Sequence, residues 1–153
     1  MSFSEDIEKF AKKCGKSSDT VVRGILMKIG ESLVNKTPVG DATHWEHPES
    51  APPGYVGGHA RASWSYSEGV LVSQEFADID KAKWEEFNVS QVRIMAAMPK
   101  KAAGKVHYIQ NSVPYIQALE DGRSRQAAGP HAIVGRTKIE FQGIIRDALA
   151  GVK

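Results

Sequence analysis

Three histidines and three carboxylates between residues 41 and 59 are the side chains in this sequence best suited to bind a metal. Imidazole and carboxylate groups ligate zinc, and a bound zinc ion can activate water for hydrolysis. The spacing does not specify a site, because His44 and His47 are three residues apart in a proline-rich segment, whereas metalloprotease histidines lie four apart on a helix. A small metal-dependent hydrolase is therefore an alternative hypothesis, with ligands drawn from Asp41, His44, Glu46, His47, Glu49 and His59.

Other patterns for catalysis or cofactor binding are missing from the sequence. No Gly-x-Ser-x-Gly segment surrounds Ser63, Ser65 or Ser67, and the glycines of residues 54–58 are not followed by the Lys-Ser/Thr of a phosphate-binding loop. The single cysteine, Cys14, falls among apolar residues, which favours a small buried side chain over a catalytic thiol. It also excludes an internal disulfide. We expect no enzymatic activity and no cofactor.

Apolar periodicity predicts two helices within residues 1–36. In the first, Phe3, Ile7, Phe10 and Cys14 recur on one face, and Gly15 is placed to end the helix. Ser17 or Ser18 can cap the second helix, which should end before Thr37 and Pro38. Its predicted inward residues are Val21, Val22, Ile25, Leu26, Ile29 and Leu33.

Residues 37–59 are the most unusual segment. They carry four prolines and four glycines, which predicts a long extended loop without regular structure. Loops of this length inside a compact domain are uncommon, and they are typically functional or become ordered on binding. Trp45, Tyr55 and Val56 make this loop suited to dock onto a surface.

Residues 60–150 are predicted to form an α+β core. Alternation from Ala60 to Ser67, a turn at Glu68-Gly69 and a second run to Phe76 predict a β-hairpin over residues 60–76. A further strand is expected at residues 105–110. This small antiparallel sheet would pack against two or three helices.

Three helices are predicted in the same core. The first covers residues 90–98, the second is short and ends at Gly122, and the third covers residues 134–150. Their predicted inward residues are Val92, Met95, Ala96 and Met98 in the first, Leu119 in the second, and Ile139, Ile144, Ile145 and Leu149 in the third.

Size and composition fit one globular domain. The chain has 153 residues, of which 41% are hydrophobic and 25% charged, so a single α+β domain over residues 1–153 is expected. No apolar run approaches the length of about 20 residues that spans a bilayer. The opening MSFSEDIEKF lacks the features of a signal peptide, so we expect a cytoplasmic protein without membrane partners.

Charge is unevenly distributed along the chain. Residues 1–98 hold 11 basic and 14 acidic residues, a net charge of −3, whereas residues 99–153 hold 9 and 4, a net charge of +5. The basic part could face nucleic acid, through Arg123, Arg125 and Arg136, or the acidic part of another subunit. A DNA-binding module is thus a further alternative, and an ordinary fluctuation of surface charge is a third explanation.

Several short blocks of the sequence carry information together: Thr37-Pro38-Val39-Gly40, residues 52–58, Ala60-Arg61-Ala62-Ser63-Trp64, residues 108–115, Leu119-Glu120-Asp121-Gly122 and Ser124-Arg125-Gln126-Ala127. Together they resemble the neck and tail-component proteins of tailed bacteriophages, of the lambdoid type described as head–tail connectors or tail-completion proteins. The blocks occur in the family's order and cover about residues 20–150. Two departures stand out: a proline is displaced in the segment from Gln126 to His131, and a long insertion precedes Arg61, as in a long-loop subgroup.

The resemblance implies a structural virion protein without catalytic activity. Such proteins assemble as rings, commonly six-fold, between the head–tail stopper or adaptor and the tail terminator or tail tube, and DNA only passes through the lumen. The chain would thus be a homo-oligomer in the virion neck, made in the host cytoplasm, and the free chain could be a monomer. A tail terminator capping the tube is the nearest rival. Expected contact residues are Trp45, Tyr55, Arg61, Glu120, Arg123, Arg125 and Gln126.

Overall fold

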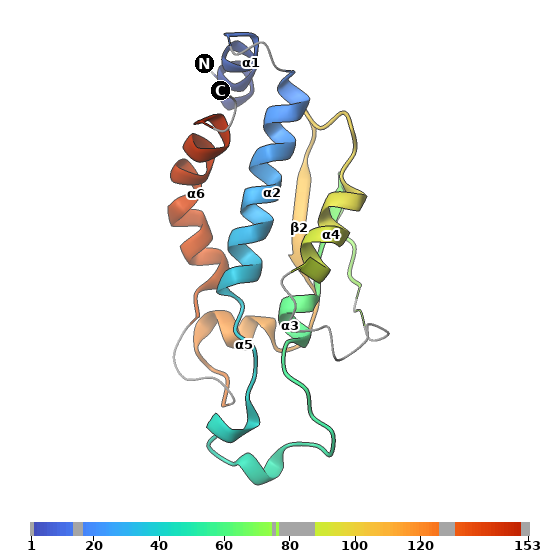
Figure 1. Cartoon of the computed structure of the whole chain (residues 1–153), viewed down its shortest axis with the longest axis vertical. Helices are drawn as coiled ribbons and strands as arrows, with labels where there is room; N and C mark the ends of the chain where they lie inside the picture. The colour runs from blue at the N-terminus through green and yellow to red at the C-terminus, as the bar shows by residue number, and fades with distance from the viewer. Residues whose placement is uncertain (1, 14–16, 75, 77–87, 126–130, 151–153) are drawn as a thin grey trace.

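A central helix, α2 (Ser18–Lys36), organises the fold, and α1 (Phe3–Lys13), α4 (Asn88–Ala97) and α6 (Ile133–Ala150) pack against it (Figure 1). The computed structural model describes the whole chain except residues 1, 14–16, 75, 77–87, 126–130 and 151–153. In that part of the chain, six α-helices and a two-stranded antiparallel sheet form one small domain, which confirms the predicted α+β class.

The two N-terminal helices were predicted well. Ser17 caps α2 by accepting a hydrogen bond from the Thr20 amide, and all six predicted apolar residues of α2 are buried or half-buried. On α1, Ile7 is buried, but Phe3 is 52% exposed, so its predicted inward position is wrong. Ala11 takes part in the buried face instead. Cys14 and Gly15 lie outside the described residues.

The predicted hairpin over residues 60–76 is wrong. Strand β1 (Trp64–Glu68) pairs with β2 (His107–Asn111), in a register that runs from Trp64 opposite Asn111 to Glu68 opposite His107. The residues before β1 form the one-turn helix α3 (His59–Ala62), and residues 70–74 form no strand. The strand predicted at residues 105–110 is confirmed, with its bounds shifted.

Helix α3 forms in place of the predicted strand because side chains from distant elements donate hydrogen bonds to its carbonyls. The carbonyl of Ala60 accepts from Asn111, that of Arg61 from Ser90, and that of Ala62 from Arg93, at 2.6–2.7 Å. The Ala60 carbonyl also accepts from the Ser63 amide at 3.3 Å, but the last carbonyls of a helix have no partners within it, so the three long-range hydrogen bonds stabilise so short a helix. The alternation of apolar and polar residues along the chain cannot indicate such long-range contacts.

Helix α4 is present where predicted, but most of its inward residues were assigned wrongly. Met98, just after the helix, is buried as expected, whereas Val92, Met95 and Ala96 are exposed. Ser90 and Ile94 occupy the buried face. The buried side of α4 includes polar groups with specific partners, which an apolar pattern overlooks.

The C-terminal helices are α5 (Ile116–Asp121), which ends at Gly122 in the left-handed conformation, and α6. Leu119 is buried as predicted. On α6, Ile139 is 85% exposed, so its predicted burial is wrong, while Ile144, Ile145 and Leu149 are half-buried. The main core joins α2, β1, α4, α5 and α6 through Leu26, Leu33, Val34, Trp64, Tyr66, Ile94, Met98, Val113, Leu119 and Ile133.

Trp64 lies at the centre of this core and is 2% exposed. We expect Trp64→Ala to lower the free energy of unfolding by about 3–5 kcal/mol, because it removes a fully buried aromatic ring. Ile139→Ala, on the exposed face of α6, should change it by less than about 0.5 kcal/mol. Denaturant unfolding followed by circular dichroism measures both. A loss below about 1 kcal/mol for Trp64→Ala would contradict the core position of this ring.

Candidate functional site

Residues 38–58, which we call the arm, project from one end of the domain, opposite α1 (Figure 1). The prediction of a long loop is confirmed apart from two one-turn 3₁₀ helices, Ala42–His44 and Pro48–Ser50. Asp41 caps the first of these by accepting from the amide and the hydroxyl of Thr43, at 2.9 and 2.7 Å. The arm therefore has a defined conformation within the single chain.

The base of the arm is closed by contact between two glycines. A Cβ atom on Gly57 would overlap the carbonyl oxygen of Gly40, and one on Gly40 would overlap the Tyr55 hydroxyl. Only residues without a side chain allow this approach. The two ends of the arm are thus held side by side.

An aromatic pair holds the middle of the arm together. The rings of Trp45 and Tyr55 meet edge to face, with centroids 4.7 Å apart. Trp45 is 6% exposed, whereas Tyr55 is 37% exposed. Burial, and then the nearby Asp41 carboxylate, raise the pKa of the Tyr55 hydroxyl above its usual value. Trp45 packs inside its own domain, and the docking role predicted for both rings stays a prediction.

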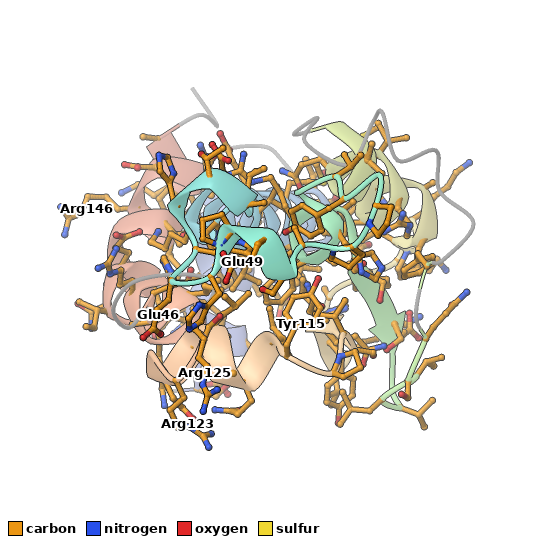
Figure 2. The ribbon with its side chains drawn as sticks, turned by 90° about the horizontal axis from the view of Figure 1, so that it is seen from below. Glu46, Glu49, Tyr115, Arg123, Arg125 and Arg146 are labelled. Carbon is orange, nitrogen blue, oxygen red and sulfur yellow. The ribbon has the colours of Figure 1, made fainter. Side chains whose placement is uncertain are left out.

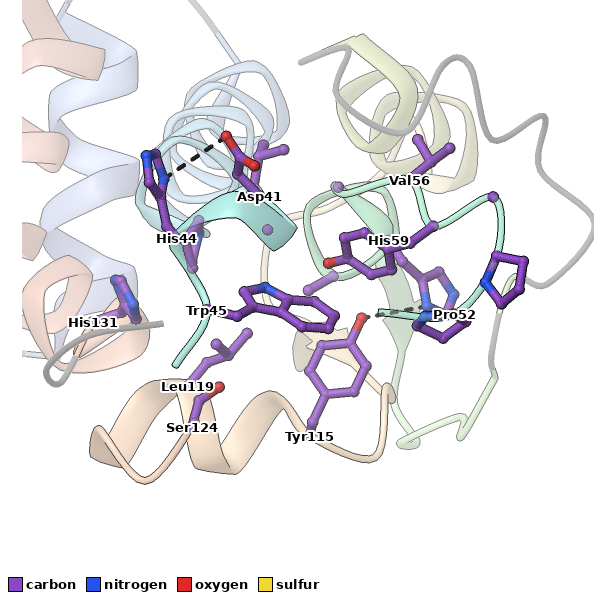
Figure 3. A pocket seen from close by; sticks show the side chains of 18 residues that line it. Asp41, His44, Trp45, Pro52, Val56, His59, Tyr115, Leu119, Ser124 and His131 are labelled. Carbon is purple, nitrogen blue, oxygen red and sulfur yellow. Dashed lines mark hydrogen bonds and ion pairs between the residues drawn. The ribbon is translucent and has the colours of Figure 1, made fainter. Parts of the chain in front are cut away.

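A cavity of about 660 Å³ lies between the arm and α5 (Figure 3). Trp45 forms its centre, and Tyr115 and Leu119 line the opposite wall. The Tyr115 hydroxyl lies 3.4 Å from His59 Nδ1, which ties α5 to α3 at the cavity edge. In the part of the chain that the structure describes, the buried indole Nε1 of Trp45 has no hydrogen-bond partner. The lining is mostly apolar, and its polar atoms include two buried nitrogens without a partner among the described residues, Trp45 Nε1 and His131 Nε2.

Two of the predicted contact residues, Arg61 and Glu120, support the arm end within the single chain, and their intersubunit contacts stay a prediction. Arg61 donates through Nε to the Thr37 carbonyl at 2.9 Å. The Glu120 carboxylate accepts from the amides of Val134 and Gly135, at 2.9 and 3.0 Å, and so satisfies the free amides at the start of α6. No local sequence pattern indicates these roles.

The predicted basic contacts lie at the same end. Figure 2 shows Arg123 and Arg125 projecting outward beside α5, and both are exposed. Arg123 pairs with Asp121 at 2.6 Å, and this bond, with one from Gln117, lowers the pKa of the Asp121 carboxyl. Gln126 lies outside the described residues.

The candidate metal ligands do not converge. His44 Nδ1 lies 3.8 Å from an Asp41 oxygen, and His47 Nδ1 lies 3.1 Å from a Glu49 oxygen, in two separate pairs. No group of three suitable ligands gathers among the described residues, so the metal-dependent hydrolase hypothesis gains no ligand set there. Likewise, no helix of the described chain is long and apolar enough to cross a bilayer.

Sequence reasoning identified the arm but missed the wall that faces it. Tyr115 and His131 both line the cavity, and no cavity-lining role was predicted for either. The wall forms because the chain places α5 opposite the arm, although the two segments are about 70 residues apart in the sequence. No local pattern signals it.

The contact at the base of the arm gives the first test. We expect Gly57→Ala to destabilise the protein by about 1–3 kcal/mol, because the new methyl group must displace backbone. A Cβ on Gly24, inside α2, meets nothing within 4 Å, so the control Gly24→Ala should stabilise by about 0.5–1 kcal/mol. Thermal and denaturant unfolding measure both changes. Equal stability of Gly57→Ala and the parent would exclude the closed base.

A second test uses pH. Hydrogen bonds from Thr43 hold the pKa of Asp41 below its ordinary value of 3.8, so this cap is fully formed above that pH and is lost as the pH falls through the lowered pKa. We expect a change in near-ultraviolet circular dichroism below about pH 3.8 that is absent in Asp41→Asn. The control variant Asp121→Asn, which lies outside the arm, should show the same spectral change as the parent protein. Identical acid profiles for the parent and Asp41→Asn would rule out this cap.

Comparison with known proteins identifies no relative. No protein-family model matches the chain, and neither a curated protein nor a solved structure is significantly similar to it. Its function is therefore inferred from its own residues.

Proposed function

We propose that this chain is a structural virion protein of a tailed phage, a neck or tail-completion protein that joins head to tail by ring assembly. The observation that carries the proposal is the meeting of the resembling blocks at the arm end of the domain. Three of these blocks, at residues 37–40, 60–64 and 108–115, are joined by direct hydrogen bonds near the base of the arm.

The bonds between blocks are specific. Thr37, from the first block, accepts from Trp64 Nε1 at 2.8 Å and, through its carbonyl, from Arg61. Asn111 donates to the Ala60 carbonyl at 2.6 Å. Glu120, from a further block, accepts hydrogen bonds from the start of α6, which lies outside the blocks. The residues that resemble the family thus serve architecture, which suits a protein that works by shape.

Ring assembly needs two different surfaces on each copy, because neighbours in a ring contact one another heterologously. The domain offers a projecting arm at one end, and its sequence divides into a part of net charge −3 and a part of net charge +5. Complementary charge favours the correct register between copies. We propose a six-fold homo-oligomer in the virion neck, assembled in the host cytoplasm.

Partners and alternatives follow from the same proposal. The ring would contact the stopper or adaptor on one side and the tail terminator or tube on the other, with DNA passing through the lumen. A tail terminator remains the rival within this class. For the DNA-binding alternative, Arg123 already pairs with Asp121, so one of its three arginines is partly neutralised.

The position in a virion can be tested directly. Antibodies against the purified chain should label the junction of head and tail in electron micrographs of the phage particles that contain it. Antibodies against the major tail-tube protein, as a control, should label the length of the tail. Absence of the chain from purified particles would exclude the proposal. If tails purified without heads carry the label only at the end of the tail tube, the tail terminator would be favoured.

The arm should be needed for assembly and not for folding. We expect that replacing residues 41–56 by a short Gly-Ser linker leaves a folded domain, because Gly40 and Gly57 are already in contact. The circular dichroism spectrum of the linker variant should keep the helical signal, while the variant should no longer be incorporated into particles. Val92→Ser, on the exposed face of α4, is the control and should assemble normally. An unfolded linker variant would mean that the arm is part of the core.

A further inference from the structure

Strand β2 has an open edge on the side away from β1. Gly69 donates to the Val106 carbonyl at 2.9 Å, next to the pair of Glu68 and His107. Along an antiparallel ladder, pairs that exchange hydrogen bonds alternate with pairs that do not, so the amide and carbonyl groups of His107 and Ile109 point away from β1. Among the residues that the structure describes, these outward groups have no hydrogen-bond partner. The edge is therefore available to a further strand.

The opposite edge of the sheet is closed. By the same alternation, the Trp64 carbonyl points away from β2, and there it accepts from Arg93 of α4 at 2.9 Å. Helix α4 packs along β1 and covers this edge. Natural sheets usually protect an edge with such a cover, a bulge, a proline or a lysine. The register of β2 is continuous, and its residues include no proline and no lysine, so its edge lacks these protections.

A groove of about 270 Å³ lies beside the end of β2 that points toward α5 (Figure 1). Its lining includes Ile109 on β2, Ile116 on α5 and Val134 on α6. Val134 is 51% exposed. Among the described residues that line the groove, only Glu120 is charged, and its carboxylate already accepts from the amides of Val134 and Gly135. The groove thus offers aliphatic surface beside the open edge, without an unpaired charge.

We propose that this edge binds an extended, uncharged segment of a partner protein as a third strand of the sheet. The outward amide and carbonyl groups recur every two residues, about 6.8 Å apart, and an extended backbone presents its own groups at the same spacing. Alternate aliphatic side chains of the segment would enter the groove, which has the same chemistry. Nucleic acid does not fit, because the described lining includes no cation to neutralise its phosphates.

A third strand would also complete an unusually small sheet. Two strands are only marginally stable by themselves, and each of these has five residues. All five residues of β2 are half-buried, so the added strand would cover surface that the single chain leaves partly exposed. The binding needs only the purified chain, so it can be tested whether or not the chain belongs to a virion.

Hydrogen exchange followed by nuclear magnetic resonance tests whether the edge is open. We expect the amides of His107 and Ile109 to exchange about tenfold or more faster than those of Tyr108 and Gln110, because only the latter pair with β1. Equal protection of all four amides in the single chain would overturn the inference.

A labelled peptide, SVTVTVS with both ends blocked, serves as the extended segment for a binding test with the full-length chain. We expect saturable one-to-one binding by fluorescence anisotropy. Two control peptides carry N-methyl groups on the valine amides or on the threonine amides. Alternate amides of a strand point to opposite edges, so one control should bind about tenfold or more weaker and the other almost as well as the parent peptide.

Variants of the chain give the matching test. Ile109→Pro removes an outward amide and no hydrogen bond to β1, so it should stay folded and bind the peptide about tenfold or more weaker. Val134→Asn, on the groove wall, should weaken binding several-fold and serves if Ile109→Pro fails to fold. Val92→Asn, similarly exposed on α4, is its matched control and should bind normally. Absence of binding at about 1 mM peptide, or binding that neither N-methylation nor these variants weaken, would reject the third strand.

Discussion

The hydrogen bonds of one buried threonine hold the arm end of this domain together. Thr37 has no exposed surface, and its amide donates to the Leu33 and Val34 carbonyls as α2 ends. Its hydroxyl donates to Leu33 and accepts from Trp64, and its carbonyl accepts from Arg61. The end of α2, the start of the arm and the α3–β1 segment therefore meet at a single residue. Valine has the same shape but would leave the Trp64 indole without an acceptor in the core.

The arm and the cavity follow from that junction. Once Thr37 fixes the direction in which the chain leaves α2, contact between Gly40 and Gly57 brings it back to α3. The edge-to-face pair of Trp45 and Tyr55 then fills the space between. Because the arm is folded on its own domain, it can present a preformed surface, and less ordering entropy is lost when it binds.

How much of this could be predicted depends on the range of the interactions. Helices α1, α2 and α6 and strand β2 follow from local periodicity, and the arm follows from its prolines and glycines. The failures have long-range causes: α3 forms because Asn111, Ser90 and Arg93 satisfy its carbonyls, and the inward face of α4 includes a buried serine. The same holds for the candidate site. Its arm side was predicted from local composition, whereas its α5 side depends on segments that are far apart in the sequence.

Helix α2 has a mechanical consequence. Its 19 residues make a rod about 28 Å long that begins beside α1 and ends at the base of the arm. Because α6 and α4 brace it on different sides, a pull on the Thr37 end of the arm is transmitted along the helix axis, whereas the other end of the arm leads through α3 into β1. A two-stranded sheet is only marginally stable by itself, so α2 is the firmer of the two attachments of the arm.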